Sequence, residues 1–298
     1  KHSSEYVIIY STNFEDNREF SKHVKPRNFT RNEKLLKTYN LVFMKTMIKN
    51  ICLLFFVCIT LFAKAQNSSN YEVIKNIPYY PQSIIDTNNY IKEQCLLDIY
   101  KPIGKTNTPV IVWFHGGGLT GGTKNIPKEL LDYGYLIVSV EYRLSPKVKA
   151  PAYIEDAAAG TAWVFNNIEK YSGNVKQIFL SGHSAGGYLD LMIGLENKWL
   201  AKHNIKTSSL AGLIPLSPQV ISHYTIRDEN NISKYQPLID TYAPLFHIKK
   251  ETPPIVLITG DRERELLGRY EENAYFFRMM KVIENPRIKL FELQGFDH

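Results

Sequence analysis

The chain has 298 residues, of which 44% are hydrophobic and 22% charged, as in ordinary globular proteins with a substantial core. The formal net charge is +7, but residues 1–43 contribute +3 and residues 44–65 another +3, which leaves +1 from Gln66 onward. This balance excludes a basic nucleic-acid-binding face on the main body of the chain, so no nucleic-acid partner is expected.

Residues 44–65 have the pattern of a secretory signal peptide. Lys45 and Lys49 precede an apolar run of 13 residues at 51–63, and small residues follow at Ala63 and Ala65. The pattern predicts cleavage before Gln66 and a secreted or periplasmic protein. A buried hydrophobic helix and a membrane anchor are the alternatives. Because the run is short for a bilayer span, no stable membrane anchor is expected.

Residues 1–43 precede this segment, begin with Lys and show no helical or strand period. We interpret them as a non-native or disordered leader rather than as folded protein. Cysteine usage fits an exported chain without a disulfide framework. Cys52 and Cys58 lie in the apolar run, and Cys95, the one thiol left after cleavage, reads as a packed strand residue.

From Gln66 onward, short apolar runs alternate with helical patterns, which predicts one α/β domain over 66–298 with a mostly parallel eight-stranded sheet flanked by helices. The first two strands lie close together, which suggests an antiparallel start. The predicted strands are 71–77, 94–100, 109–114, 135–142, 177–181, 211–216, 254–259 and 288–293, and the predicted helices are 124–133, 152–171, 185–200 and 268–284.

A histidine and three glycines, His115 to Gly118, follow the predicted strand 109–114 directly. A glycine triplet can be a simple flexible turn. Its backbone N–H groups can also stabilise the negative charge that builds on a carbonyl oxygen during acyl transfer. Gly117 and Gly118 are the candidate donors, and His115 is expected to fix this loop rather than to act as a base.

The stretch Gly182-His183-Ser184-Ala185-Gly186 stands between a β-rich run and a helical pattern. A Gly-x-Ser-x-Gly pattern alone is a weak signal, but the strand–turn–helix context favours a nucleophile elbow over an ordinary turn. We therefore expect Ser184 to be a nucleophile, and the N–H of Ala185 to complete the group of donors for the oxyanion.

Residues 217–253 interrupt the alternation of strands and helices with several prolines and aromatics and no clear period. A connection of this length inside a compact domain is usually functional or holds small elements of its own. We interpret it as an insertion or small cap above the sheet, with an ornamental surface loop as the alternative.

An acid and a histidine should follow the serine in this order. The loop after the strand 254–259 offers Asp261 and Glu263, between which the sequence does not decide; Glu263, three residues after Gly260, is slightly favoured. His298 follows the last predicted strand, whereas the histidines before the acid loop stand in the wrong order. His298 is therefore the expected general base.

These motifs together resemble the α/β-hydrolases, and within them the carboxylesterases with an HGGG motif, including the hormone-sensitive-lipase-like and feruloyl/acetyl-esterase-like groups. The stretches YRLSP at 142–146 and PAYIEDAAAGTAWV at 151–164 add to the likeness, which covers about 80–298. The resemblance implies a serine esterase that forms an acyl-enzyme and needs no cofactor or metal. Its expected substrates are short-chain or polysaccharide-linked esters.

Two features depart from this family. The acid loop GDRERELLGRYEEN has no unambiguous aspartate three residues after its glycine, and the sequence stops at His298, where relatives continue into a closing helix. We expect a chain that stops there to be poorly active or unstable beside one with a natural extension. A peptidase or lipase on the same fold, or an inactive binding relative, are the alternative functions.

Overall fold

The computed structural model describes residues 70–298 except 267. The predicted leader (1–43), the predicted signal peptide (44–65) and the first residues of the predicted domain lie outside this range. Within the described residues, no helix is both long and apolar enough to cross a membrane.

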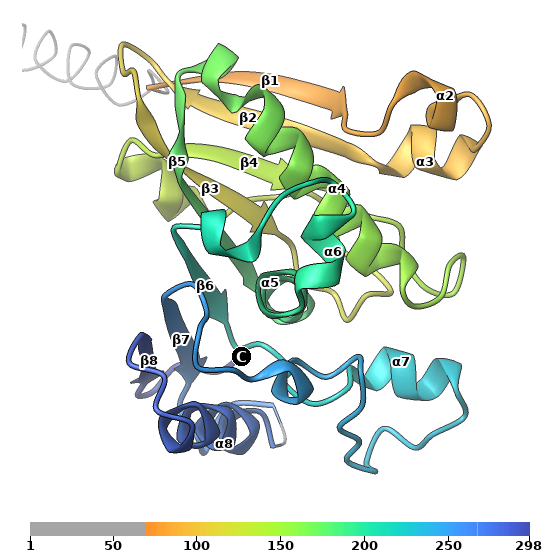
Figure 1. The fold of residues 1–298 in the computed structure, drawn as a ribbon, viewed down its shortest axis with the longest axis vertical. Helices are drawn as coiled ribbons and strands as arrows, with labels where there is room; N and C mark the ends of the chain where they lie inside the picture. Colours follow the sequence, from red (N-terminus) through yellow and green to blue (C-terminus); the bar gives the residue numbers. More distant parts are fainter. Residues whose placement is uncertain (1–69, 267) are drawn as a thin grey trace, which may run out of the picture. The chain divides into compact units, whose positions relative to one another are not determined.

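The described residues form one eight-stranded sheet in the order β1-β2-β4-β3-β5-β6-β7-β8 (Figure 1). The first three strands in this order pair antiparallel, and all the others pair parallel. The strands are β1 Tyr71–Pro78, β2 Leu96–Pro102, β3 Thr108–Phe114, β4 Leu136–Val140, β5 Gly173–His183, β6 Gly212–Leu216, β7 Ile255–Gly260 and β8 Ile288–Leu293. All eight predicted strands and the antiparallel start are therefore confirmed.

Helices connect the parallel strands, as crossover connections require. The longest are α4 Ala152–Asn167, α5 Ala185–Leu195 and α8 Arg269–Val282. The shorter elements are α2 Gln82–Ile85, α3 Asn89–Gln94, η1 Lys128–Asp132, η2 Ile168–Tyr171, α6 Asn197–Ala201, η3 Thr207–Ser209, α7 Tyr224–Glu229 and η4 Pro244–His247.

The predicted helix 124–133 is wrong: only the short 3₁₀ helix η1 forms there. Pro127 precedes it directly, and Gly134, with φ +70°, follows shortly after its end. Proline is tolerated at the start of a helix but not inside one, and a left-handed glycine ends a helix. These two residues therefore leave room for little more than one turn. Cys95 is buried, but it ends α3 instead of lying in a strand.

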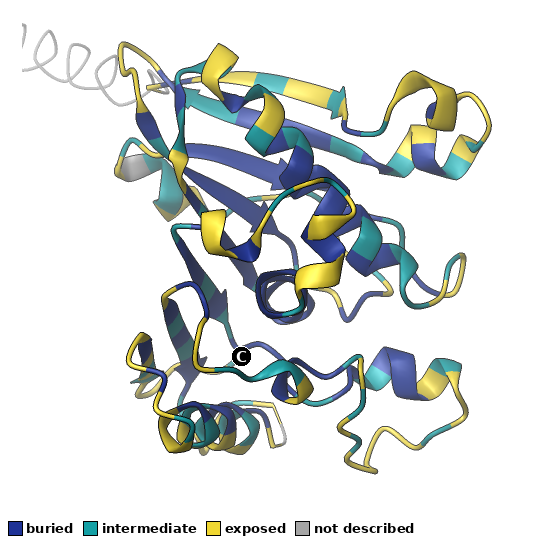
Figure 2. Cartoon of the chain, viewed as in Figure 1, coloured by how far each residue is buried: buried dark blue, intermediate teal, exposed yellow. Residues whose placement is uncertain are grey.

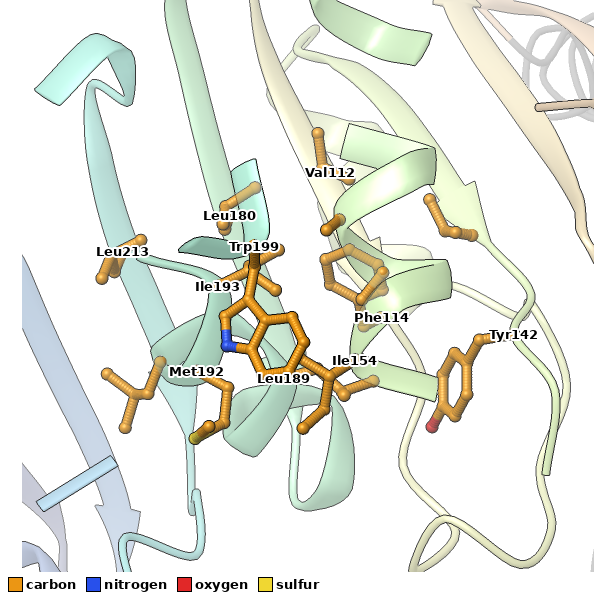
Figure 3. Packing of buried hydrophobic residues seen from close by; sticks show 14 of the residues in the cluster. Val112, Phe114, Tyr142, Ile154, Leu180, Leu189, Met192, Ile193, Trp199 and Leu213 are labelled. Carbon is orange, nitrogen blue, oxygen red and sulfur yellow. The ribbon is translucent and has the colours of Figure 1, made fainter. Parts of the chain in front are cut away.

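The main core lies between the sheet and the helices α4, α5 and α6. Figure 3 shows Val112 and Phe114 of β3 facing Leu189 and Ile193 of α5, with Trp199 of α6 beside them. Every residue of α5 is buried, and Figure 2 shows this helix dark blue, whereas the outer surfaces of α8 and the end of α7 are yellow. Such burial on all sides fixes the N-terminal end of α5, where Ser184 stands.

The segment 217–253 contains α7 and η4, joined by irregular chain. Its first residues follow β6, and the N-terminal half of α7 is buried against the rest of the domain. The segment thus has small elements of its own, and several of its side chains reach the candidate site described next.

Candidate active site

Ser184 occupies a sharp turn between β5 and α5. Its backbone has φ +55° and ψ −113°, a region that residues with a side chain rarely adopt. Two backbone bonds hold it there: its N–H donates to Leu216 O at 2.8 Å, and its carbonyl accepts the N–H of Tyr188 at 2.9 Å. The predicted strand–turn–helix geometry is thus present, and the positive end of α5 starts directly after the hydroxyl.

The glycines on either side of Ser184 are required because backbone approaches them closely. A Cβ on Gly182 would lie 2.6 Å from the carbonyl oxygen of Phe114, and one on Gly186 would lie 2.0 Å from the same atom. Real Cβ atoms do not come so near, so a side chain at either position would push β3 and α5 apart.

The glycine loop after β3 passes beside the elbow. A Cβ on Gly116 would lie 3.5 Å from the Cβ of Ser184. Gly117 and Gly118 have φ +113° and +64°, which glycine adopts without strain. Within the described part of the chain, no acceptor is paired with the N–H of Gly117 or Gly118. Both N–H groups, with that of Ala185 at the start of α5, are thus available to an oxyanion.

His115 holds this loop, as expected from the sequence. Its Nε2 lies 2.8 Å from a carboxylate oxygen of Glu141, and its ring stacks on Tyr142, 4.3 Å between centroids. The Tyr142 hydroxyl donates to the carbonyl of His115 at 2.8 Å. Glu141 also accepts the backbone N–H of Lys124 at 2.9 Å. Because these contacts occupy the His115 ring, the side chain stabilises the conformation of the glycine loop.

The carboxylate that meets His298 belongs to Glu265, a residue the sequence reasoning did not select. One oxygen of Glu265 lies 2.5 Å from His298 Nδ1. The other accepts bonds from the Ser217 hydroxyl at 2.5 Å and from the backbone N–H of Gly260 at 3.1 Å. The Glu265 side chain is only 1% exposed, so it is a buried, fully bonded carboxylate.

The geometry contradicts the expectation that Glu263 or Asp261 pairs with His298. The chain makes a helical turn after β7, with the N–H of Glu265 donating to Asp261 O at 2.8 Å. This turn brings the side chain of Glu265 back to the strand end and leaves Glu263 exposed. Asp261 binds the histidine loop instead, because its carboxylate accepts the N–H of Gly295 at 2.8 Å. The sequence signal for Glu265 was its place in the same acidic loop, two residues beyond the favoured position.

His298 lies at the elbow, where its ring is 4.6 Å from that of His183, the residue before Ser184. The Nε2 atom of His183 lies 2.7 Å from the backbone oxygen of His298. In Figure 1 the C-terminal end is marked beside β6 and α5, in keeping with these contacts. Since Nδ1 of His298 faces Glu265, Nε2 is the ring atom left to accept a proton.

Electrostatics favour a neutral His298 beside an ionised Glu265. Burial lowers the pKa of His298 below its ordinary value; Glu265 raises it, while the nearby His183 and Arg269 lower it further. Burial raises the pKa of Glu265, but the bonds from Ser217 and backbone N–H groups and the charge of His298 outweigh it, so the pKa ends below its usual value. A neutral imidazole oriented by a carboxylate is a competent general base at neutral pH.

A groove of about 570 Å³ opens beside the elbow. Gly116 and His183, which flank Ser184, lie on its wall together with His115. Its other lining residues are Trp113, Gly122, Thr123, Asn125, Ile126, Pro127 and Leu216. The lining mixes apolar side chains with hydroxyl and amide groups, and the groove is large enough for a small organic group. Among the described residues, no cluster of three or more His, Cys, Asp or Glu could hold a metal ion.

Comparisons with known proteins agree with this geometry. Esterase LipC of Mycobacterium tuberculosis is 22% identical over 234 residues, which cover 68% of this chain and 56% of LipC. The match therefore spans little more than half of that relative's length.

Two solved structures share the fold. A truncated carbohydrate esterase from gut microbiota superposes with a TM-score of 0.63 at 19% identity, covering 78% of this chain and 90% of that one. Esterase 2 of Thermogutta terrifontis, in a form phosphoramylated by tabun, gives a TM-score of 0.59 at 22% identity over 77% of this chain and 84% of its own. The described residues thus have the α/β-hydrolase fold expected from the sequence.

A family model gives the assignment. The BD-FAE model matches residues 97–267, from the start of β2 through the acid loop, and so includes the glycine loop, the elbow and Glu265. Because this match spans more than half of the sequence, the chain belongs to the BD-FAE family.

Proposed function

We propose that the chain is a serine esterase that hydrolyses carboxylic esters through an acyl-enzyme on Ser184. The observation that supports this most directly is the pairing of Glu265 with His298, 2.5 Å apart, beside the strained Ser184 elbow. A relative and structural neighbours named as esterases add support. The acid in this proposal is Glu265, in place of Glu263 or Asp261.

In the first half of the reaction, His298 Nε2 takes the proton of the Ser184 hydroxyl as the oxygen attacks the ester carbonyl carbon. The carbonyl oxygen becomes an anion and accepts bonds from the N–H groups of Gly117, Gly118 and Ala185. Glu265 keeps the Nδ1 proton of His298 in place and stabilises the imidazolium. The tetrahedral intermediate then collapses, and His298 gives its proton to the leaving alcohol.

In the second half, water replaces the alcohol. His298 Nε2 takes a proton from the water as its oxygen attacks the acyl carbon, and the same N–H groups hold the new oxyanion. Collapse breaks the bond to Ser184 Oγ, which regains the proton from His298. The acid product leaves and the enzyme returns to its starting state, without any cofactor in the sequence of steps.

The substrates we propose are short-chain acyl esters and acyl esters linked to carbohydrate. The groove beside Gly116 and His183 supports this because it offers both apolar and hydroxyl or amide contacts to an alcohol group. One structural neighbour is named a carbohydrate esterase. An acetyl or feruloyl group on polysaccharide would combine a small acid with such an alcohol.

Hydrolysis of p-nitrophenyl acetate, butyrate and octanoate tests the reaction, with Ser184→Ala as the control. We expect activity that falls with acyl chain length and drops by about 10⁴-fold or more in the variant. Release of acetate or ferulate from substituted xylan tests the carbohydrate part. Hydrolysis that survives in Ser184→Ala, or a folded wild-type protein with no activity, would contradict the proposal.

We also propose that the protein is exported to the periplasm or beyond the cell, on the evidence of the basic and apolar pattern at 44–65. Expression of the full sequence in a bacterial host, followed by fractionation and N-terminal sequencing, tests this. We expect a mature chain that starts at Gln66 outside the cytoplasm. An uncleaved chain retained in the cytoplasm would contradict it.

A further inference from the structure

One short stretch of chain contacts both halves of the candidate catalytic machinery. At its start, the Ser217 hydroxyl donates to a carboxylate oxygen of Glu265 at 2.5 Å. At its end, the Thr225 hydroxyl donates to the carbonyl oxygen of Gly118 at 2.5 Å. We call residues 217–225 the brace. Both hydroxyl-bearing residues are buried, and both bonds join positions far apart in the sequence.

Ser217 is held in an unusual backbone conformation. Its φ is +45°, in the left-handed region, which costs free energy for a residue other than glycine. Its N–H donates to Ile258 O at 2.7 Å, and its carbonyl accepts a bond from the guanidinium of Arg269 at 2.6 Å. Arg269 is itself only 4% exposed. The Ser217 hydroxyl therefore has a fixed direction, toward Glu265.

Helix α8 fastens the next residues of the brace. Asn273 donates its amide to Pro218 O at 2.9 Å, and the Glu272 carboxylate accepts the N–H of Val220 at 3.1 Å. Together with Arg269, these side chains stand at positions i, i+3 and i+4, so they share one face of the helix. The first turns of α8 thus hold the brace through its backbone groups.

Residues of the brace also hydrogen-bond to the first residues of α7. The side-chain oxygen of Gln219 accepts the N–H of Tyr224 at 3.0 Å, at the first residue of the helix. His223 caps the same helix through its Nδ1, which accepts the N–H of Thr225 at 3.3 Å. A Cβ on Gly118 would lie 1.8 Å from the Tyr224 hydroxyl oxygen, so the start of α7 packs directly on the glycine loop.

We propose that Ser217 and Thr225 are positioning residues, through which one α8-anchored stretch of chain sets the orientation of the acid Glu265 and of the oxyanion loop at Gly118. The inference rests on the esterase function proposed above and adds two residues to it. Neither residue is proposed to touch the substrate, and each acts through a hydrogen bond to a group that is part of the proposed machinery.

Replacement of Ser217 tests the first bond. Ser217→Gly is the preferred variant, because glycine adopts φ +45° without strain. Ser217→Ala, which removes the hydroxyl alone, is measured beside it. We expect kcat to fall by about 10- to 100-fold, the range for loss of a hydrogen bond to a charged group.

The pH profile separates this role from a merely structural one. The charges of Arg269 and His298 act on Glu265, and Glu265, His183 and Arg269 act on His298. Without the Ser217 hydroxyl, the pKa of Glu265 rises and its charge acts more strongly on His298, whose pKa rises too. We therefore expect the acid limb of kcat/KM to move to higher pH. A general loss of stability would lower activity without moving the limb.

Thr225→Val tests the second bond, since valine keeps the shape and removes the hydroxyl. We expect kcat to fall by about 10-fold, as for one hydrogen bond that orients a loop, with KM and the acid limb unchanged. Thr225→Ser should restore the activity. This pattern differs from that of Ser217→Gly, because Thr225 supports the oxyanion loop rather than the acid.

Ser222→Ala and Thr207→Val are the matched controls. Ser222 is a buried brace residue whose hydroxyl binds Asp240 at 2.6 Å, and Thr207 is a buried threonine that binds Asn197 at 2.7 Å. Both should leave the acid limb in place and lose less kcat than the test variants. An acid limb that stays fixed in Ser217→Gly, or a Thr225→Val variant with full kcat, overturns the positioning roles. Inactive wild-type protein instead overturns the esterase function itself.

Discussion

The elbow and the acid loop lie at the carboxyl ends of nearby strands, but they are held in different ways. At the elbow, backbone sterics decide: Gly182 and Gly186 leave no space for a side chain, and Ser184 has a positive φ. In the acid loop, hydrogen bonds fix the conformation: the Glu265 carboxylate is held by its bonds with Ser217, Gly260 and His298. A steric requirement is visible in the local sequence, whereas a choice among neighbouring acids depends on partners far along the chain.

The largest effect on activity should separate Glu265 from Glu263, its neighbour in this loop. Glu265→Gln removes the negative charge beside His298, and we expect kcat/KM to fall by about 10³-fold or more, as when the triad acid of a serine hydrolase is replaced. Glu263→Gln, an exposed neighbour two residues away, is the matched control and should stay within about twofold of wild type. Steady-state kinetics on p-nitrophenyl acetate provides the measurement. Equal losses would contradict the assignment.

The next effect should be on stability, at the elbow. Gly186→Ala puts a Cβ 2.0 Å from the carbonyl oxygen of Phe114, so we expect a loss of about 3 kcal/mol or more in the free energy of unfolding. Gly121→Ala is the control, since its Cβ would lie 3.9 Å from its nearest neighbour. Urea denaturation followed by tryptophan fluorescence measures both. A stable Gly186→Ala protein would show that the elbow is less crowded than described.

The pH profile of kcat/KM tests the surroundings of His298, which contacts both the elbow and the acid loop. Burial, with the charges of His183 and Arg269, lowers the pKa of this histidine, and a lower pKa keeps the base neutral in more acidic solution. We therefore expect the acid limb of kcat/KM to have its midpoint below about 6.5. Removal of the Glu265 charge, which raises the pKa, should move the limb of the residual activity lower still. A midpoint above 7 would contradict this picture.

The smallest effect should come from Asp261→Asn. Asp261 binds the backbone N–H groups of Gly295 and Glu263, and both bonds lower its pKa. An amide oxygen can replace one of these acceptors, so we expect only a few-fold loss in kcat/KM. Kinetics beside Glu265→Gln measures the difference. A loss as large as that of Glu265→Gln would restore Asp261 as the candidate acid.

The features that could be predicted from the sequence are those that depend on local residues rather than on distant partners. The eight strands, the turn at Ser184 and the glycine loop are visible in the sequence because each depends on an apolar run or a glycine at a fixed place. The role of His298 as the base stays a prediction. The predicted helix 124–133 does not form because Pro127 and Gly134 limit the helical stretch between them to about one turn. The carboxylate that contacts His298 is not one of the two expected, because a helical turn from Asp261 to Glu265, rather than a spacing from Gly260, sets which side chain faces inward.

The brace, like the acid loop, depends on contacts between residues that are far apart in the sequence. Its contacts join Ser217 to Glu265 and Thr225 to Gly118 across 48 and 107 residues of sequence. No local pattern in 217–253 indicates them, since serine and threonine are common in irregular connections. The interpretation of this segment as an insertion above the sheet stays a prediction, whereas the hydrogen-bond partners of Ser217 and Thr225 come from the fold.

The most direct test is to label the protein with a fluorophosphonate probe and locate the adduct by peptide mass spectrometry. The account predicts an adduct on the peptide that contains Ser184, formed at the wild-type rate in Glu263→Gln and at least about 100-fold more slowly in Glu265→Gln. An adduct on another residue, or equal labelling rates in the two variants, would contradict a nucleophile at Ser184 activated by His298 and Glu265.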